Sequence, residues 1–198
     1  MSRIVVDAVR NSSASTDGIT LANDGSITFP GNATCSGTAT GFGGGKLLQV
    51  IQTEKTDTTS TSSTSWSDIS GMSVTITPSS STSKIFVETR FKAAAGDVVY
   101  IALTTGDGTS IISTSGSGYT ETPSIMIYSG GNSSGESWYN GDMSTVCKLH
   151  SPNTTNAVTY KLRWRVNGNT AYLNRNMDMG AQYNVAVAST ITAMEVAA

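Results

Sequence analysis

Histidine and charge are scarce in this chain of 198 residues, and each shortage argues against a class of function. The single histidine, His150, is a poor supply for catalytic bases and metal sites, which are most often built on this side chain. Charged residues make up 13% of the chain and the net charge is -2, so we expect no nucleic-acid binding. The carboxylates are scattered, and residues 41–45, "GFGGG", lack the Lys-Ser/Thr ending of a phosphate loop. We therefore predict no enzyme, no catalytic or metal site and no cofactor.

Long apolar runs are missing as well, and cysteines are few. No segment approaches the roughly 18 apolar residues of a membrane-spanning helix, so we expect no membrane insertion. The start, "MSRIVVDAVRNSS", lacks the apolar core of a signal peptide. Cys35 and Cys147 lie far apart in sequence, which favours two unpaired thiols in a reducing compartment and leaves a disulfide as the alternative.

Serine and threonine take the place of charged residues on the expected surface. Threonine is β-branched and fits a pleated surface, so it can replace Lys and Glu on the outward side of strands. The stretch at 58–65, "TTSTSSTS", therefore predicts exposed β-structure with Ser/Thr turns. A weakly charged surface is a solubility risk for a free monomer and suits a subunit that is covered by copies or partners.

The first 45 residues have a pattern of their own. Two short alternating runs in "ITLANDGSITF" flank Asn23-Asp24-Gly25, which predicts a hairpin because these residues tolerate the positive φ of tight turns. A lone two-stranded hairpin is marginal in water and needs packing from elsewhere. Residues 41–45 are typical of a flexible joint. We therefore divide the chain into an N-terminal segment at 1–45 and a C-terminal domain at 46–198.

Strand patterns and turn signals recur throughout the C-terminal domain, and nothing there predicts a helix of three turns or more. In "SKIFVETRFK" the inward residues are Ile85, Val87 and Phe91, and the outward residues are Glu88, Arg90 and Lys92. In "VTYKLRWRV" the inward face consists of Val158, Tyr160, Leu162, Trp164 and Val166. Trp66 is predicted to close one end of the core. The pattern indicates an all-β fold, an antiparallel, jelly-roll-like β-sandwich preceded by the short N-terminal hairpin.

Two polar features on these strands have competing interpretations. The basic stripe formed by Lys161, Arg163 and Arg165 is most simply a solvated strand face; a contact with another subunit or an anion is the alternative. Cys147 and His150 stand at i and i+3 on one predicted strand, where side chains point to opposite faces. This spacing disfavours a Cys-His nucleophile.

A loop-rich stretch at 116–140 offers the best candidate binding surface. It contains Tyr119, Trp138 and Tyr139 beside small polar residues, as in "GGNSSGESWYNGD". Loops on a rigid strand framework commonly carry recognition, and aromatic rings give large contact areas at low entropic cost. The alternative is that the aromatic pair anchors a long hairpin to the core.

Both ends of the chain carry recognisable segments. Residues 45–92, "GKLLQVIQTEKTDTTSTSSTSWSDISGMSVTITPSSSTSKIFVETRFK", run from a Gly-Lys-apolar-Leu-Gln-Val strand through a Ser/Thr-rich stretch to a "TPSS...SKI" turn. The chain ends with "STITAMEVAA", a Ser-Thr-apolar-Thr...Met-Glu strand. Together these segments resemble a module of virion proteins of tailed phages, particularly marine ones. The segment "GITLANDGSITFPG" resembles the short β-repeats that precede such modules in fibre-like proteins.

The resemblance implies a structural virion protein, assembled in the host cytoplasm, and most simply a homotrimeric tail fibre or short appendage. Its N-terminal segment would attach to other virion proteins and trimerise, with three copies burying the apolar residues Ile19, Leu21, Ile27 and Phe29. The C-terminal domain would present a surface to a host cell-surface glycan. Two alternatives stay open: a capsid decoration or cement protein, and a carbohydrate-binding module outside phage.

Overall fold

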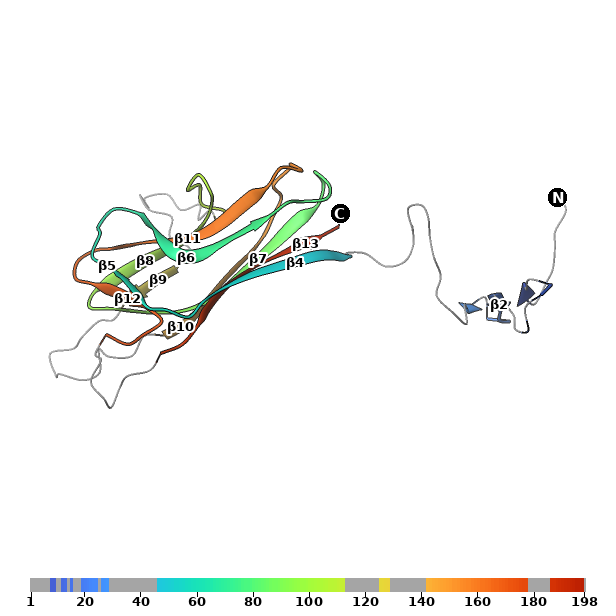
Figure 1. Cartoon of the computed structure of the whole chain (residues 1–198), viewed down its shortest axis with the longest axis horizontal. Coiled ribbons are helices and arrows are strands. Elements are labelled where there is room, and N and C mark those ends of the chain that lie inside the picture. Colours follow the sequence, from blue (N-terminus) through green and yellow to red (C-terminus); the bar gives the residue numbers. More distant parts are fainter. Residues whose placement is uncertain are drawn as a thin grey trace. The chain divides into compact units, whose positions relative to one another are not determined.

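The structure is a computed structural model, and it describes residues 8–9, 12–13, 15, 19–24, 26–28, 46–112, 125–128, 142–177 and 186–197. These residues form antiparallel strands, turns and bends, and no helix among them could span a membrane. The chain divides into two compact units, Met1–Gly44 and Gly45–Ala198 (Figure 1). The all-β, sandwich-like fold predicted from the sequence is confirmed.

The N-terminal unit contains a sheet of three short strands. They are β1 (Ala8–Val9), β2 (Ile19–Leu21) and β3 (Ile27–Thr28), in the order β1-β2-β3. β2 and β3 form the predicted hairpin, closed by a hydrogen bond of 3.0 Å from the Ala22 amide to the Ser26 carbonyl. The Asp24 carboxylate accepts a hydrogen bond of 2.9 Å from the Ser26 amide within the turn. The pairing of β1 with β2 was not predicted from the sequence.

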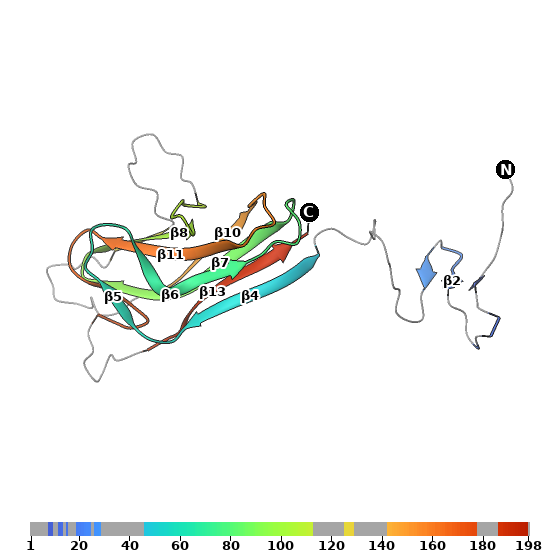
Figure 2. The same ribbon diagram turned by 45° about the horizontal axis from the view of Figure 1, so that its top comes forward.

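The C-terminal unit consists of two antiparallel sheets that pack face to face (Figure 2). The first sheet contains β4 (Leu47–Lys55), β5 (Thr59–Thr61), β7 (Lys84–Ala95), β10 (Asp142–His150), β12 (Ala171–Leu173) and β13 (Ser189–Val196). The second sheet contains β6 (Ser67–Ile76), β8 (Val98–Thr105), β9 (Ile125–Tyr128) and β11 (Val158–Val166), in the order β6-β11-β8-β9.

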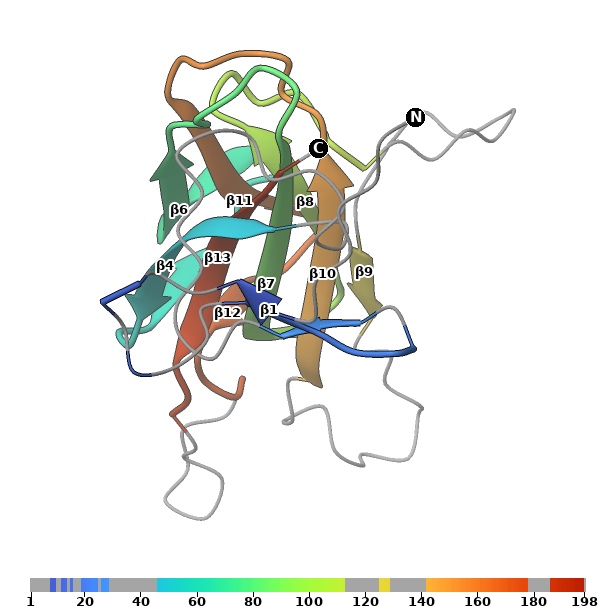
Figure 3. The same ribbon diagram turned by 90° about the vertical axis from the view of Figure 1, so that its right-hand side faces the viewer.

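The first sheet is built around β7, the longest strand. β13 pairs with residues 84–90 of β7 and β12 pairs with residues 93–95, so these two strands follow each other along one edge of β7. β10 pairs with residues 85–93, along the other edge. β4 lies beyond β13, and β5 lies beyond β12. Figure 3 shows β4, β13, β7 and β10 side by side in that order.

One asparagine connects the strands of this sheet at the point where β4 gives way to β5 and β13 gives way to β12. Asn174, which follows β12, is fully buried and has a positive φ of 63°. Its side-chain amide donates hydrogen bonds of 2.7 Å to the Lys55 carbonyl and 2.9 Å to the Asp57 carbonyl. Its backbone amide donates to the Lys92 carbonyl on β7 at 2.9 Å, and its side-chain oxygen accepts from the Ser189 hydroxyl. These bonds connect the residue that follows β12 to the end of β4, to the turn between β4 and β5, and to the start of β13.

The core lies between the two sheets and follows the predicted strand alternation. Ile85, Val87 and Phe91 of β7 are completely buried, and Trp164 of β11 is 2% exposed. Tyr160, Leu162 and Val166 are buried on the same side of β11 as Trp164, which confirms the inward face predicted for that strand. The remaining large core residues among those described are Ile69, Met72, Val74, Ile76, Val99, Ile101, Leu103, Ile111, Ile127, Val146, Leu173 and Ile191.

The segments that carry the resemblance meet at one end of the sandwich, around Glu195. This residue of β13 is fully buried, and its carboxylate accepts a hydrogen bond of 2.6 Å from the Gln49 side chain on β4. Gln49 also donates to the Thr77 carbonyl at 2.7 Å, in the turn after β6. Burial would raise the pKa of Glu195, but hydrogen bonds from Ser79, Gln49 and Ser83 outweigh it and lower the pKa to about 2. The "KLLQV", "TPSS" and "AMEV" motifs are therefore parts of one ionised, buried cluster.

Candidate functional site

The residues predicted to bind a receptor or to form the trimer contact are only partly within the described structure. Tyr119, Trp138 and Tyr139 lie outside the described residues, and so does Phe29. Leu21 and Ile27 stand directly opposite each other in the N-terminal hairpin, and Ile19 lies on the same face, two residues from Leu21. Ile27 is 57% exposed within the single chain. Three of the predicted apolar residues therefore lie on one face of this small sheet, and Leu21 and Ile27 are exposed there.

Two residues of the basic stripe, Lys161 and Arg163 of β11, form ion pairs with Asp68 of β6. The Lys161 ammonium lies 2.8 Å from one carboxylate oxygen of Asp68, and the Arg163 Nε lies 3.0 Å from the other. Arg163 also donates a hydrogen bond of 3.1 Å to the Trp66 carbonyl. The hydrogen bond from Lys161 and the charges of both cations hold the pKa of Asp68 below its usual value, against a smaller effect of burial. The stripe is thus not a free cationic surface.

The third cation, Arg165, lies against two aromatic rings. Its guanidinium carbon is 4.1 Å from the centroid of Tyr100 and 5.7 Å from that of Trp66. Because Trp164 pairs with Ser67, the neighbouring Trp66 and Arg165 meet on the outer face of the sheet. The prediction that Trp66 closes one end of the core is therefore wrong: its ring is half-buried beneath an arginine. A single strand pattern gave no information about this pairing.

His150 and Cys147 point to opposite faces of β10, as predicted. His150 Nδ1 lies 2.9 Å from the Tyr160 hydroxyl, on the core side. Burial lowers the pKa of His150, aided by Lys148, and burial raises the pKa of Tyr160 to about 12. Cys147 is a free, exposed thiol on the outer side, whereas Cys35 lies outside the described residues. No nucleophile pair is formed by these two side chains.

Acidic, histidine and cysteine side chains form no metal-binding cluster within the described ranges. Among those residues, no group of three such side chains is placed to hold an ion. Asp107 instead stabilises a turn: it accepts hydrogen bonds from the Thr105 hydroxyl at 2.5 Å and the Thr109 amide at 3.0 Å. These bonds lower the pKa of Asp107 to about 2. This aspartate is accounted for by local structure.

A line of apolar side chains crosses the outer face of the first sheet. Val50 of β4 is directly opposite Met194 of β13, Met194 is opposite Phe86 of β7, and Phe86 is opposite Leu149 of β10. We call these four residues the apolar row. Val50 is 51% exposed and Leu149 is 46% exposed, while Met194 and Phe86 between them are half-buried. Leu48, two residues before Val50, is 40% exposed. Sheet pairing thus joins four residues from distant parts of the sequence into one apolar surface.

The next positions on the same face are polar. Gln52, Thr192, Glu88 and Cys147 form the adjacent row, in which the Gln52 amide donates a hydrogen bond of 2.8 Å to the Thr192 hydroxyl. The row after it contains Glu54, Thr190, Arg90 and Thr145. Polar rows therefore border the apolar row on the side away from Lys46, the residue before β4.

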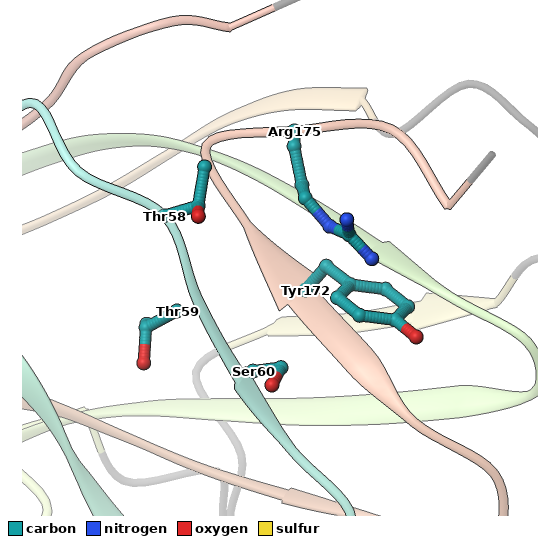
Figure 4. Close-up of a pocket in the computed structure, with 5 residues that line it drawn as sticks. All are labelled: Thr58, Thr59, Ser60, Tyr172 and Arg175. Carbon is teal, nitrogen blue, oxygen red and sulfur yellow. The ribbon is translucent and has the colours of Figure 1, made fainter. Parts of the chain in front are cut away.

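A pocket of about 250 Å³ opens beside β5 and β12, at the far end of this sheet. It is lined by Thr58, Thr59, Ser60, Tyr172 and Arg175 (Figure 4). The guanidinium carbon of Arg175 lies 3.7 Å from the centroid of the Tyr172 ring. Ser60 is the register partner of Tyr172 across the two strands. Residues separated by more than 110 positions in the chain thus form one polar cavity.

Sequence patterns alone did not identify this pocket. The stretch at 58–65 reads as a polar β-surface, and Arg175 follows a short strand without any motif around it. A comparison of this chain with protein-family models gives no match, and neither does a comparison with curated proteins.

Proposed function

We propose that the chain is a structural protein of a tailed-phage particle, a homotrimeric tail fibre or short appendage. In this proposal the N-terminal unit attaches to other virion proteins and contributes to the trimer. The C-terminal sandwich is presented to a glycan of the host surface. The observation that supports the proposal most strongly is the apolar row on the outer face of the first sheet.

The apolar row is best explained by contact with further copies of the same chain. Covering a half-exposed Val, Leu or Met side chain contributes on the order of 1 kcal/mol, so a strip of four gives a useful but modest gain. The N-terminal sheet also leaves apolar side chains uncovered, with Val9 52% and Ile27 57% exposed. Each unit therefore has apolar surface to bury, and identical copies would cover both kinds of surface in one assembly. Closed point-group symmetry is the usual form of such assemblies.

The ionised cluster around Glu195 gives the proposal its second support. Three motifs within the segments that resemble the phage virion module are brought together by Gln49, Ser79 and Glu195. A motif whose residues share one buried hydrogen-bond network describes a structural framework rather than a chemical site. This is what a particle protein built on a common scaffold requires.

Light scattering on the purified full chain tests the oligomeric state. We expect a mass near three times 20.6 kDa. The double variant Val50→Ser, Leu149→Ser should shift the mass towards the monomer. The matched control is Gln52→Ser with Cys147→Ser, which changes the same two strands in the adjacent polar row and should remain trimeric. A monomeric parent at micromolar concentration would exclude the homotrimer.

The position of the chain on the particle is tested by labelling intact virions with an antibody against residues 46–198. Label at the tail is the expected result. Label spread over the capsid shell would replace the fibre with a decoration protein of the same fold. Particles that contain none of the chain would reject both assignments and favour a carbohydrate-binding module outside phage.

A further inference from the structure

We propose that the pocket beside β5 and β12 binds an acidic saccharide through Arg175, which receives the carboxylate or sulfate group of one sugar unit. The proposed binding follows from the residues that line the pocket and from their contacts. Only the use of this binding in host attachment rests on the function proposed for the chain.

Arg175 forms no ion pair with any of the residues that the structure describes. No described residue accepts a hydrogen bond from its Nε, which is buried. The guanidinium instead lies flat over the Tyr172 ring, at 3.7 Å from the centroid. Arginine keeps its charge at any physiological pH and offers a planar fork of donors that fits a carboxylate or sulfate. The guanidinium is thus held by stacking on Tyr172 and lines the pocket, so an anion in the pocket would lie beside it.

The acidic residue next to the pocket-lining Thr58 in the sequence is Asp57, and it does not neutralise Arg175. Asp57 precedes Thr58, but its carboxylate lies 2.8 Å from the Lys55 ammonium. That hydrogen bond, with the charge of Lys55, lowers the pKa of Asp57. Lys92 on β7 lies two residues from Ala94, the register partner of Tyr172, and adds positive charge to this end of the sheet. Among the described residues that line the pocket, Arg175 is the charged one, which favours an anionic ligand.

The other walls of the pocket provide hydroxyl groups. In Figure 4, Thr58 and Ser60 lie on the side of their strand that faces Tyr172 and Arg175. Hydroxyl groups both donate and accept, so they match the hydroxyls of a sugar ring without a fixed polarity. The Tyr172 hydroxyl can add a further partner. This combination of one fixed cation with several neutral hydroxyls fits a sugar that carries a single acidic group.

The size of the cavity limits the ligand to about one sugar unit. Its volume of about 250 Å³ is below the roughly 300–1,000 Å³ of pockets for drug-sized ligands. An oligosaccharide could therefore place only one acidic unit in the pocket, with its neighbours along the surface of the sheet. We expect weak binding to a single unit, which copies in an oligomer would strengthen by multivalency.

The experiment measures binding of three probes to the full-length protein by calorimetry and ligand-observed NMR: glucuronic acid, glucose 6-sulfate and glucose. We expect one or both acidic probes to bind and glucose to bind at least about tenfold more weakly, since a hydrogen bond between charged groups is roughly twice as strong as a neutral one. Binding of glucuronic acid alone identifies a carboxylate site, and binding of glucose 6-sulfate alone identifies a sulfate site.

Variants assign the binding to the pocket. Arg175→Gln should weaken the acidic probe about tenfold, and Arg175→Lys should restore part of the affinity because it keeps charge but loses the fork. The matched control is Arg90→Gln, which removes an exposed arginine from the same sheet outside the pocket. Thermal melts confirm that each variant is folded.

Three results would overturn the proposal: no binding of either acidic probe, equal binding of glucose, or equal losses in Arg175→Gln and Arg90→Gln. The outcome is separable from that of the proposed function. A trimer on the virion that binds none of the probes would reject the pocket alone. Binding by a monomer that no particle contains would reject the virion role alone.

Discussion

Ser79 donates two hydrogen bonds to the same carboxylate oxygen of Glu195, from its backbone amide at 2.7 Å and from its hydroxyl at 2.6 Å. The two residues are 116 positions apart, and their contact ties the turn before β7 to the last strand. Because the Gln49 amide holds the other carboxylate oxygen, all three segments depend on one negative charge. Hydrogen bonds to a charged group of this kind are roughly twice as strong as neutral ones.

We predict that Glu195→Gln destabilises the C-terminal unit by about 1–3 kcal/mol, because a neutral amide cannot accept the bonds from Ser79 and Gln49 equally well. Chemical denaturation of the full chain measures the change. The control is Glu54→Gln, an exposed carboxylate on β4, which should change stability by less than about 0.5 kcal/mol. Equal stability of both variants would show that the Glu195 cluster adds nothing to the fold.

The same carboxylate predicts how stability depends on pH. The folded pKa of Glu195 is about 2 and the ordinary value is 4.5, so the unfolded chain binds the proton more readily. Its contribution is therefore fully present above pH 4.5 and is lost as the pH falls from 4.5 towards 2. Melting curves across this window should show a steeper acid loss for the parent than for Glu195→Gln. Parallel curves would contradict the assignment.

Trp164→Ala should destabilise the protein by about 3–5 kcal/mol, the usual cost of removing a large buried aromatic side chain. Trp164 is 2% exposed between the sheets. Trp66→Ala is the natural comparison, because Trp66 is half-buried and makes its ring contact with Arg165. We expect a loss of about 1 kcal/mol there, on the scale of a cation–π contact. Thermal melts that rank the two variants in the opposite order would reject this account of the core.

Asn174→Ala should cost about 2–4 kcal/mol, since it removes the side-chain donor to the Lys55 and Asp57 carbonyls and keeps a positive φ without glycine or asparagine. Asn153→Ala measures the cost of the positive φ alone, because Asn153 has a φ of 53° but is exposed. Denaturant midpoints of the two variants separate the contributions. If both fall equally, the amide bonds of Asn174 contribute little.

A fragment of residues 46–198 should fold without the N-terminal unit. Its core and its hydrogen-bond clusters lie within that range, which agrees with the division of the chain after Gly44. A cooperative thermal transition near that of the full chain is the expected result. We also expect the fragment to be missing from particles assembled in its presence. An insoluble fragment, or one that is incorporated normally, would show that the two parts are not separable in this way.

The strand faces could be read from the sequence because alternation is a local property. The inward positions of Trp164 and Phe91 follow from residues two places away, and the hairpin at Asn23 follows from its turn residues. Register is not local: nothing in the sequence near Val50 indicates that Met194, Phe86 and Leu149 stand beside it. The pocket depends in the same way on the pairing of Ser60 with Tyr172. Surfaces formed by the pairing of distant strands were therefore not predicted, although the faces of several of these strands were.

The double role of Asn174 has a consequence for how this fold can vary. Its carbonyl accepts a hydrogen bond of 3.3 Å from the Val187 amide, and its side chain binds Ser189, so the chain leaves and re-enters the sheet at one anchored point. The positions of residues 174 and 187 are thus fixed relative to each other, and the entropic cost of joining two fixed points rises by only about 0.6 kcal/mol for each doubling of the chain between them. Arg175, which lines the pocket, follows Asn174 directly in the chain. Sequence added between these two positions, by evolution or by design, would therefore leave the register of β12 and β13 unchanged.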